Sequence, residues 1–197
     1  MKNIICDKKE AILKAAMELI AEHGFHGAPT AMIAERAGVG AGTIYRYFEN
    51  KDDLIKVLHQ NFEGKLVPFL LDGYSLDQPV RLRFIHIGAA LLRYFIGNPV
   101  EFRFWEQFIN SPYGVEFRRD KIFGDPGKSG GCDIVQALFK EGVEKKLIKD
   151  LPLVVLYALF FAPTMALARD HILGFVILDE GLMQAAMESC WNAVKCC

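Results

Sequence analysis

The chain has 197 residues, of which 52% are hydrophobic and 24% are charged, and its formal net charge is -1 at pH 7. This length is enough for one or two domains with a hydrophobic core, and the composition excludes an intrinsically disordered chain. The nearly balanced charge argues neither for nor against a nucleic-acid partner, because a basic surface can be local.

Five cysteines occur, at positions 6, 132, 190, 196 and 197, and no two of them form a C-x-x-C pair. No secretory leader precedes them, so we expect reduced thiols in a cytoplasmic protein rather than a disulfide scaffold. The adjacent Cys196 and Cys197 are interpreted as incidental rather than as a redox or metal handle. The sequence predicts no metal site and no cofactor.

Residues 30–51 predict two short helices joined by a turn that contains a glycine. Thr30 is expected to be the N-cap of the first helix, and Gly38 is expected to end it, because glycine adopts a positive φ at little cost. In the second helix, Ile44 and Phe48 are spaced i, i+4 and should point inward. A helix-turn-helix presents the outer side of its second helix to the major groove. The side chains expected on that outer side are Thr43, Tyr45, Arg46 and Tyr47.

The entrance to this second helix consists of the small residues Gly40, Ala41 and Gly42, which would let the backbone approach another surface closely. Asn50 is expected to cap the following helix, and Lys51 in its first turn could contact a phosphate. The alternative is that Lys51 is a solvated surface lysine. The pattern alone also fits other helical hairpins with a glycine turn.

Residues before and after this pattern make its interpretation more specific. The N-terminal quarter of the chain closely resembles the DNA-binding domain of the tetracycline-repressor (TetR/AcrR) family. The residues that carry the resemblance are Ala15-Ala16, Leu19-Ile20, Gly24-Phe25, Thr30, Ile33-Ala34, Ala37-Gly38-Val39, Thr43-Ile44-Tyr45, Tyr47-Phe48, Lys51 and Leu54. The resemblance implies an all-α fold with a three-helix helix-turn-helix head at residues 1–50. It also implies a helical domain at residues 51–197 that binds a small molecule and dimerises.

By position, the resemblance implies a set of residues that contact double-stranded DNA. These are Thr30, Ala41, Gly42, Thr43, Tyr45, Arg46, Tyr47 and Lys51. Gly40 and Ala41 depart from the polar residues that are common in the family at these positions. Direct hydrogen bonding to bases should therefore rest mainly on Arg46 and Tyr45, aided by DNA shape.

The remaining sequence reads as helical throughout, since apolar residues recur at intervals of three and four and no stretch shows sustained alternation. Asn98, Asp150 and Asp179 are expected to be N-caps. The Gly-Lys-Ser within residues 124–131 lacks the earlier glycine and the strand that a P-loop requires, so we interpret this stretch as a connection. The predicted helices are Lys51–Leu71, Gln78–Ile96, Pro99–Asn110, Cys132–Leu147, Pro152–Ala168 and Glu180–Val194.

Residues 151–168 contain no charged side chain and are long enough for a transmembrane helix to be considered. Pro152 and Pro163, together with the flanking Asp150 and Arg169, argue against insertion. A helix covered on all sides by protein has the same composition. The resemblance implies such a helix, packed against its own domain on one side and a partner subunit on the other.

Aromatic residues are unusually dense in this second part of the chain. Large rings are difficult to pack without gaps, so the cluster could enclose an apolar or aromatic ligand, although each residue by itself could equally fill a core. The candidate ligand contacts are Phe62, Phe84, Leu91, Phe102, Trp105, Phe108, Leu138, Phe160 and Thr164. Tyr94, Glu106, Gln107 and Thr164 could orient a ligand, whereas Arg83, His86 and Arg93 are expected on an exposed polar stripe.

The last predicted helix has two neighbouring stripes. Leu182, Ala186, Ser189 and Ala193 form a line of mostly small residues that suits close helix packing. Met183, Met187, Cys190 and Val194 lie beside it. This double stripe suits a four-helix interface in a homodimer, and a dimer would place two reading helices on an inverted repeat.

The sequence therefore predicts a ligand-responsive transcriptional regulator, most simply a cytoplasmic repressor that a small apolar or aromatic effector releases from DNA. An enzyme is not expected, because neither an H-E-x-x-H pair nor a G-x-S-x-G elbow occurs. The alternative is a membrane-associated or structural helical protein that uses Leu151–Ala168 as an inserted or buried helix.

Overall fold

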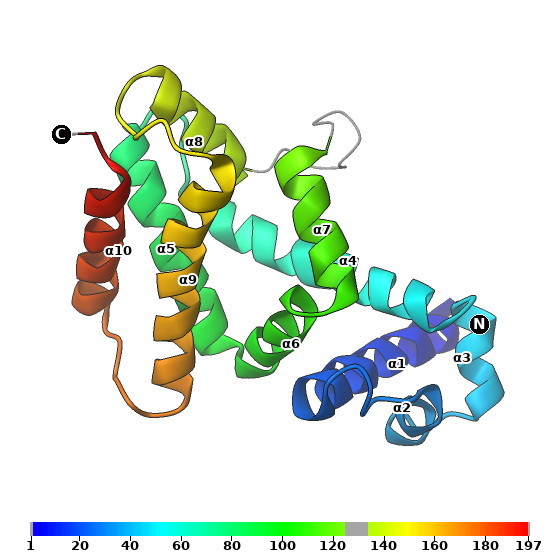
Figure 1. Ribbon diagram of the computed structural model, residues 1–197. Coiled ribbons are helices and arrows are strands. Elements are labelled where there is room, and N and C mark those ends of the chain that lie inside the picture. Colours follow the sequence, from blue (N-terminus) through cyan, green and yellow to red (C-terminus); the bar gives the residue numbers. More distant parts are fainter. Residues whose placement is uncertain (1, 125–133, 197) are drawn as a thin grey trace. The chain divides into compact units, whose positions relative to one another are not determined.

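The computed structural model describes the backbone of residues 2–124 and 134–196 and the side chains of residues 8–124 and 134–196. These residues form helices and no strand, which confirms the predicted all-α fold (Figure 1). The helices are α1 (Lys2–His23), α2 (Thr30–Arg36), α3 (Ala41–Tyr47), α4 (Lys51–Leu71), α5 (Val80–Gly97), α6 (Pro99–Ile109), α7 (Pro112–Phe123), α8 (Ile134–Glu144), α9 (Leu153–Ile172) and α10 (Glu180–Val194).

Helix boundaries agree closely with the periodicity of the sequence, since α4 and α10 begin and end where they were predicted. Asp179 caps α10 as expected, whereas the N-cap of α9 is Pro152 and not Asp150. Helix α7 was not predicted, because it buries only Gly114 and has no apolar stripe to reveal it. The predicted start of α8 at Cys132 and the connection at 125–131 lie outside the described residues.

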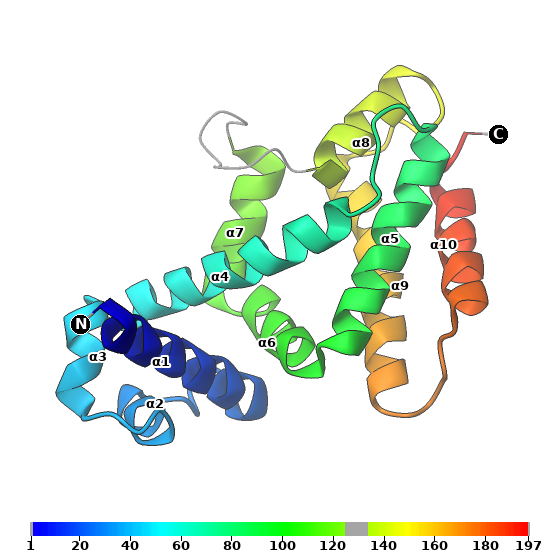
Figure 2. The same cartoon turned by 180° about the vertical axis from the view of Figure 1, so that it is seen from behind.

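The chain divides into two compact units. The first contains residues 1–66 and 98–115, and the second contains residues 67–97 and 116–197. The predicted boundary after residue 50 differs from this division, because α6 packs against α1 and therefore belongs with the N-terminal helices (Figure 2). Helices α4 and α7 each begin in the first unit and continue along the chain into the second.

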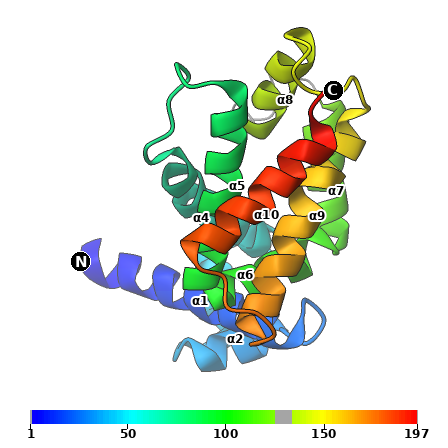
Figure 3. The ribbon, with the colours of Figure 1, turned by 90° about the vertical axis from the view of Figure 1, so that its left-hand side faces the viewer.

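The second unit is built around α5, which packs against α8, α9 and α10. The ring of Phe84 on α5 lies 4.9 Å from that of Phe160 on α9 and 5.4 Å from that of Trp191 on α10, measured between ring centroids. Helices α9 and α10 lie side by side (Figure 3). Burial of these large rings contributes to the stability of this unit.

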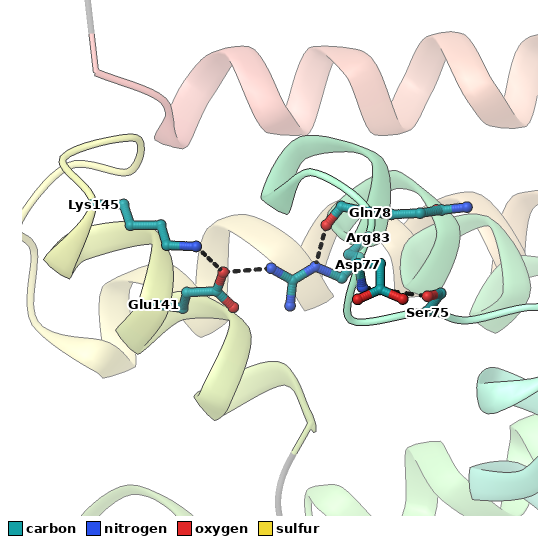
Figure 4. A network of polar contacts seen from close by, with 6 residues as sticks. All are labelled: Ser75, Asp77, Gln78, Arg83, Glu141 and Lys145. Atoms are coloured by element: carbon teal, nitrogen blue, oxygen red, sulfur yellow. Dashed lines mark hydrogen bonds and ion pairs between the residues drawn. The ribbon is translucent and has the colours of Figure 1, made fainter.

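Arg83 is buried, with 3% of its surface exposed, so its prediction as part of an exposed stripe was wrong. Its guanidinium donates to the backbone oxygen of Gln78 at 2.9 Å and to the Glu141 carboxylate at 2.6 Å (Figure 4). Lys145 also donates to Glu141, at 2.7 Å. Burial is the largest single influence on the pKa of Arg83 and by itself would lower it, but the interactions with Glu141 and Tyr74 together outweigh burial and raise that pKa. The network joins α5 to α8.

Replacing Arg83 by methionine is expected to lower the free energy of unfolding by about 2 kcal/mol, because it leaves Glu141 and the Gln78 carbonyl without their buried donor. The hydrogen bond from Arg83, then that from Lys145, lowers the pKa of Glu141. The ionised Glu141 carboxylate therefore stabilises the fold at pH values above the ordinary pKa of glutamate. That contribution is lost as the pH falls through the lowered pKa. Chemical denaturation of R83M and the unmodified protein at neutral and acid pH measures both effects.

The matched control is Arg81→Met, because Arg81 forms an ion pair with Glu188 in which the arginine is 48% exposed. Such a surface pair contributes roughly 0 to 1 kcal/mol. Equal destabilisation by R81M and R83M, or a difference between R83M and the unmodified protein that does not shrink in acid, would contradict the assigned role of the buried arginine.

Candidate DNA-binding site

The turn between α2 and α3 has the geometry predicted for a helix that ends at a glycine. Gly38 has a φ of +66°, and its backbone N–H donates to the oxygen of Glu35 at 3.0 Å. The N–H of Val39 donates to the oxygen of Ala34 at 2.9 Å. These two bonds form a Schellman motif, which satisfies the last carbonyls of α2 and turns the chain towards α3.

Thr30 is not the N-cap of α2, as was predicted, because Pro29 occupies that position and Thr30 is the first helical residue. Its hydroxyl is instead 3.2 Å from the hydroxyl of Tyr45 on α3. Pro at the preceding position fixes an extended backbone there, so Thr30 lies inside the first turn. The two hydroxyls therefore link the start of α2 to α3.

Helix α3 has one buried and one exposed side. Ile44 is buried on α3, and Phe48 is buried where the helix ends, as their spacing predicted. Tyr45 is 58% exposed and Arg46 is also exposed. The other predicted DNA contacts on this helix are exposed or half-buried, namely Ala41, Gly42, Thr43 and Tyr47. The short helix thus offers hydroxyl, aromatic and guanidinium groups on its accessible side.

Lys51 lies in the first turn of α4, and its ammonium donates to the backbone oxygen of Phe25 at 2.6 Å. Partial burial lowers the pKa of this ammonium. An ammonium has three N–H donors, so this bond leaves others for a phosphate. The bond to Phe25 also holds the Lys51 ammonium beside the connection between α1 and α2.

The first turn of α4 is closed by two local hydrogen bonds. The side-chain oxygen of Asn50 accepts from the N–H of Asp53 at 2.8 Å, which confirms Asn50 as the cap. The Asp53 carboxylate in turn accepts from the N–H of Glu49 at 3.0 Å. These two reciprocal bonds form a cap that fixes the first turn of α4, which carries Lys51.

Arg36 is held by acidic residues of α1. Its guanidinium lies 3.1 Å from the Glu22 carboxylate and 3.6 Å from that of Glu18. The hydrogen bond from Arg36 lowers the pKa of Glu22. These contacts describe an ordinary surface charge paired with α1, and Arg36 is not among the predicted DNA contacts.

The nine candidate ligand contacts divide between the two units. In the first unit they are Phe62, Phe102, Trp105 and Phe108, and in the second they are Phe84, Leu91, Leu138, Phe160 and Thr164. All except Trp105, which is half-buried, are buried. The sequence alone did not separate these residues, since both sets lie on helices with similar apolar periodicity.

The aromatic cluster of the first unit includes a residue that sequence reasoning missed. His59 on α4 stacks on Phe108, with ring centroids 4.2 Å apart, and lies 6.1 Å from the ring of Trp105. Phe62 stacks on Trp105 at 5.4 Å. In the sequence, His59 lies one helical turn before Phe62, so it could have been included in the cluster. The sequence does not indicate which rings His59 stacks on.

In the second unit, the polar group proposed to orient a ligand has a partner inside the protein. The Thr164 hydroxyl donates to the backbone oxygen of Phe160 one turn earlier, at 2.7 Å. A surface hollow of about 350 Å³ occurs between α5 and α10, and Leu82, Ile85 and Arg93 are among its lining residues. None of the nine candidate ligand contacts lines it.

The two stripes of α10 differ in burial. Met183, Met187, Cys190 and Val194 are buried within their own unit, so the second half of the predicted double stripe is not accessible to a partner. Leu182, Ser189 and Ala193 are exposed and Ala186 is half-buried. Beside them, α9 buries one face and leaves Val154, Val155, Ala158, Ala162 and Ala166 exposed. Both exposed sets consist of small or apolar residues.

Helix α9 is the one helix in the described parts of the chain that is long and apolar enough to cross a membrane. Its most apolar window has a mean hydropathy of 1.5, and 22% of that window is buried. A helix with one face in a core and the other in an interface has the same length and composition as a membrane span.

Two of the five cysteines can be described, and both Cys190 and Cys196 are free thiols. Burial raises the pKa of Cys190. The side chains of Cys6, Cys132 and Cys197 lie outside the described residues.

Two family profiles together match most of the chain. One, described as bacterial regulatory proteins of the tetR family, matches residues 12–58. The other, described as a tetracyclin repressor-like C-terminal domain, matches residues 79–195. The first covers the two-helix motif and the second covers α5 to α10.

Some relatives match the whole length of this chain and others match only part of it. A helix-turn-helix-type transcriptional regulator from Haemophilus influenzae is 39% identical over 201 residues, which cover 99% of this chain and 100% of that protein. A fatty acid metabolism regulator protein from Bacillus subtilis is 45% identical over 56 residues. This match spans only 29% of the length of the fatty acid metabolism regulator. The match to a second B. subtilis regulator spans 41% of that regulator's length.

Solved structures show the same fold. A transcriptional regulator of the TetR family from Vibrio parahaemolyticus is 33% identical, with 96% of this chain and 99% of that one covered and a TM-score of 0.76. A TetR family regulator from Marinobacter aquaeolei is 23% identical, with 99% of both chains covered and a TM-score of 0.82. At that lower identity the second likeness concerns the fold alone.

Proposed function

Because the chain belongs to the tetR family of bacterial regulatory proteins and is a DNA-binding transcriptional regulator, we propose that it is a homodimeric repressor. In this proposal, an apolar or aromatic small molecule binds the C-terminal helical part and releases the protein from an inverted-repeat operator. The observation that carries the proposal is helix α3, which buries Ile44 and leaves Tyr45 and Arg46 accessible.

The residues of the site divide into two roles. The hydroxyls of Thr30 and Tyr45 lie close together at the start of α2, which suits a shared contact to one phosphate. Arg46, exposed on the same helix, is then the side chain best suited to bidentate contact with a guanine. Base readout therefore rests more on Arg46 than the sequence suggested, and Lys51 adds a phosphate contact.

The dimer is proposed to form through the exposed sides of α9 and α10. Small residues at Ala158, Ala162 and Ala166 recur at every fourth position, so another helix could approach the backbone of α9 closely. Exposed Leu182, Ser189 and Ala193 continue this surface on the neighbouring α10. A second copy using the same surfaces would complete a four-helix interface with twofold symmetry.

The effector is proposed to bind among the candidate ligand contacts of the second unit, namely Phe84, Leu91, Leu138, Phe160 and Thr164. Support comes from their chemistry, since aromatic and aliphatic side chains outnumber polar ones by far. A compound that orders one arrangement of these helices would shift DNA affinity by about 1 to 3 kcal/mol, a typical coupling energy. Thermal-shift measurements with apolar and aromatic compounds would identify it, because stabilisation increases with ligand excess over Kd.

The proposed function is tested by fluorescence anisotropy with the DNA upstream of the protein's own gene at two salt concentrations. A specific complex should survive competition by unrelated DNA at moderate salt, and its stoichiometry should be two chains per site. The absence of a competitor-resistant complex would refute the repressor proposal. Separation of membrane and cytosol after expression tests the proposed cytoplasmic location, which requires the protein to remain in the soluble fraction.

Replacing Lys51 or Arg46 by alanine is expected to give two different losses. K51A should weaken binding to all DNA sequences about tenfold and reduce the salt slope by about one ion, because it removes a phosphate contact. R46A should lower discrimination at particular bases by about 1 to 3 kcal/mol and affect unrelated DNA much less. Each is the control for the other, and equal losses on specific and unrelated DNA for R46A would contradict its role in base readout.

A further inference from the structure

The first turn of α4 is held from a second direction, by a residue outside the N-terminal helices. Tyr113, in the first turn of α7, donates its phenol hydroxyl to the Asp52 carboxylate at 2.5 Å. Asp52 follows Lys51 directly in the chain, and all these residues belong to the first unit. Tyr113 therefore contacts the same turn that carries the proposed phosphate ligand.

The ring of Tyr113 also packs on the residue that accepts from Lys51. The rings of Tyr113 and Phe25 are 5.4 Å apart, and the ring of Phe25 also lies 6.5 Å from that of Phe104 on α6. The Phe25 backbone oxygen accepts from the Lys51 ammonium at 2.6 Å. One phenylalanine thus joins Tyr113 to the lysine through its ring and its carbonyl group.

The phenol of Tyr113 is a hydrogen-bond donor to Asp52 at neutral pH. Partial burial, followed by the hydrogen bond to Asp52, raises the pKa of Tyr113 to about 12. The hydroxyl consequently remains protonated and donates to a carboxylate, which makes a charge-assisted bond. The bonds of Asn50 and Asp53 fix the same turn, which begins four residues after α3 ends.

We propose that Tyr113 is a positioning residue for DNA binding, which holds Lys51 and the start of α4 through Asp52 and Phe25. The inference rests on the proposed function, because it assigns Lys51 to a phosphate. It adds a route for regulation, since α7 continues from Tyr113 into the second unit of the chain. A movement of α7 that breaks the bond to Asp52 would release the lysine and weaken DNA binding.

The test is a double-mutant cycle on operator affinity with Tyr113→Phe and Lys51→Ala. Y113F should weaken binding about fivefold in the unmodified protein, the effect of losing one hydrogen bond that is partly open to solvent. In the K51A background Y113F should cause no further loss, because the tyrosine acts through the lysine. Tyr157→Phe removes a phenol hydroxyl from α9 and serves as the matched control, with unchanged affinity expected.

A loss of the same size in both backgrounds would mean that Tyr113 supports the fold in general, and unchanged affinity of Y113F would mean that it has no role. Either result overturns the inference.

A second measurement does not depend on DNA. The rate at which acetic anhydride acetylates Lys51 in the free protein, followed by mass spectrometry, should rise in Y113F and stay unchanged in Y157F. An unchanged rate in Y113F overturns the inference even if the operator complex forms. If the unmodified protein forms no operator complex, the repressor proposal fails, and the acetylation rate alone decides whether Tyr113 holds Lys51.

Discussion

Replacing Ala162 on α9 by glutamate is expected to make the protein monomeric and to weaken specific operator binding by at least about 100-fold. Ala162 lies at the middle of the exposed line of small residues on α9. At the proposed interface a glutamate would lie against the small residues of the partner's helices. Its charge would be buried without a partner, and its bulk would separate the helices.

The loss in DNA affinity follows from the loss of the dimer. When one reading helix of a dimer binds its half of an inverted repeat, the second helix is already next to the other half, so its binding is intramolecular. Two monomers must bind the two halves independently. Analytical ultracentrifugation measures the oligomeric state and anisotropy measures the operator affinity.

Ala137→Glu, an exposed alanine on α8, is the matched control and should change neither quantity. A dimer of unchanged stability in A162E would refute the proposed interface.

Replacing Phe160 by alanine is expected to lower the free energy of unfolding by about 3 to 5 kcal/mol and the Tm by roughly 10 °C. Phe160 is 0% exposed, and the rings of Phe84 and Phe161 both lie 4.9 Å from it. Removing its ring deletes these contacts and leaves a cavity that the rigid helices around it fill only in part. Differential scanning calorimetry measures the loss.

Phe175→Ala is the control, since Phe175 is 78% exposed and its removal should change stability by less than about 0.5 kcal/mol. Benzene and indole distinguish a packed core from a ligand pocket at this place. A packed core predicts that they stabilise only F160A, by entering the new cavity. If they stabilise the unmodified protein as well, Phe160 already lines an accessible pocket. An F160A protein of unchanged stability would contradict the packing described for α5 and α9.

Much of the DNA-binding motif was predictable because the relevant interactions are local. The Gly38 turn and the Asn50 cap depend on residues within about one helical turn of each other, and both were confirmed. The exposed side of α3 followed from the i, i+4 spacing of its inward residues. By contrast, the bond between Thr30 and Tyr45 joins positions 15 residues apart, which no local pattern relates.

The tertiary structure alone decided which partner each polar or aromatic side chain meets. Periodicity placed Arg83 on a polar stripe, but Glu141 on α8 supplies the carboxylate that makes its burial tolerable. Tyr113 lies on a helix without an apolar stripe, so its contact with Asp52 left no mark in the sequence. The sequence by itself determined the helices that carry an apolar stripe, the caps at Asn50 and Asp179 and the outward side of α3, because backbone hydrogen bonding and side-chain periodicity act over a few residues. Pairing between helices depends on how distant segments pack, and that was decided only in three dimensions.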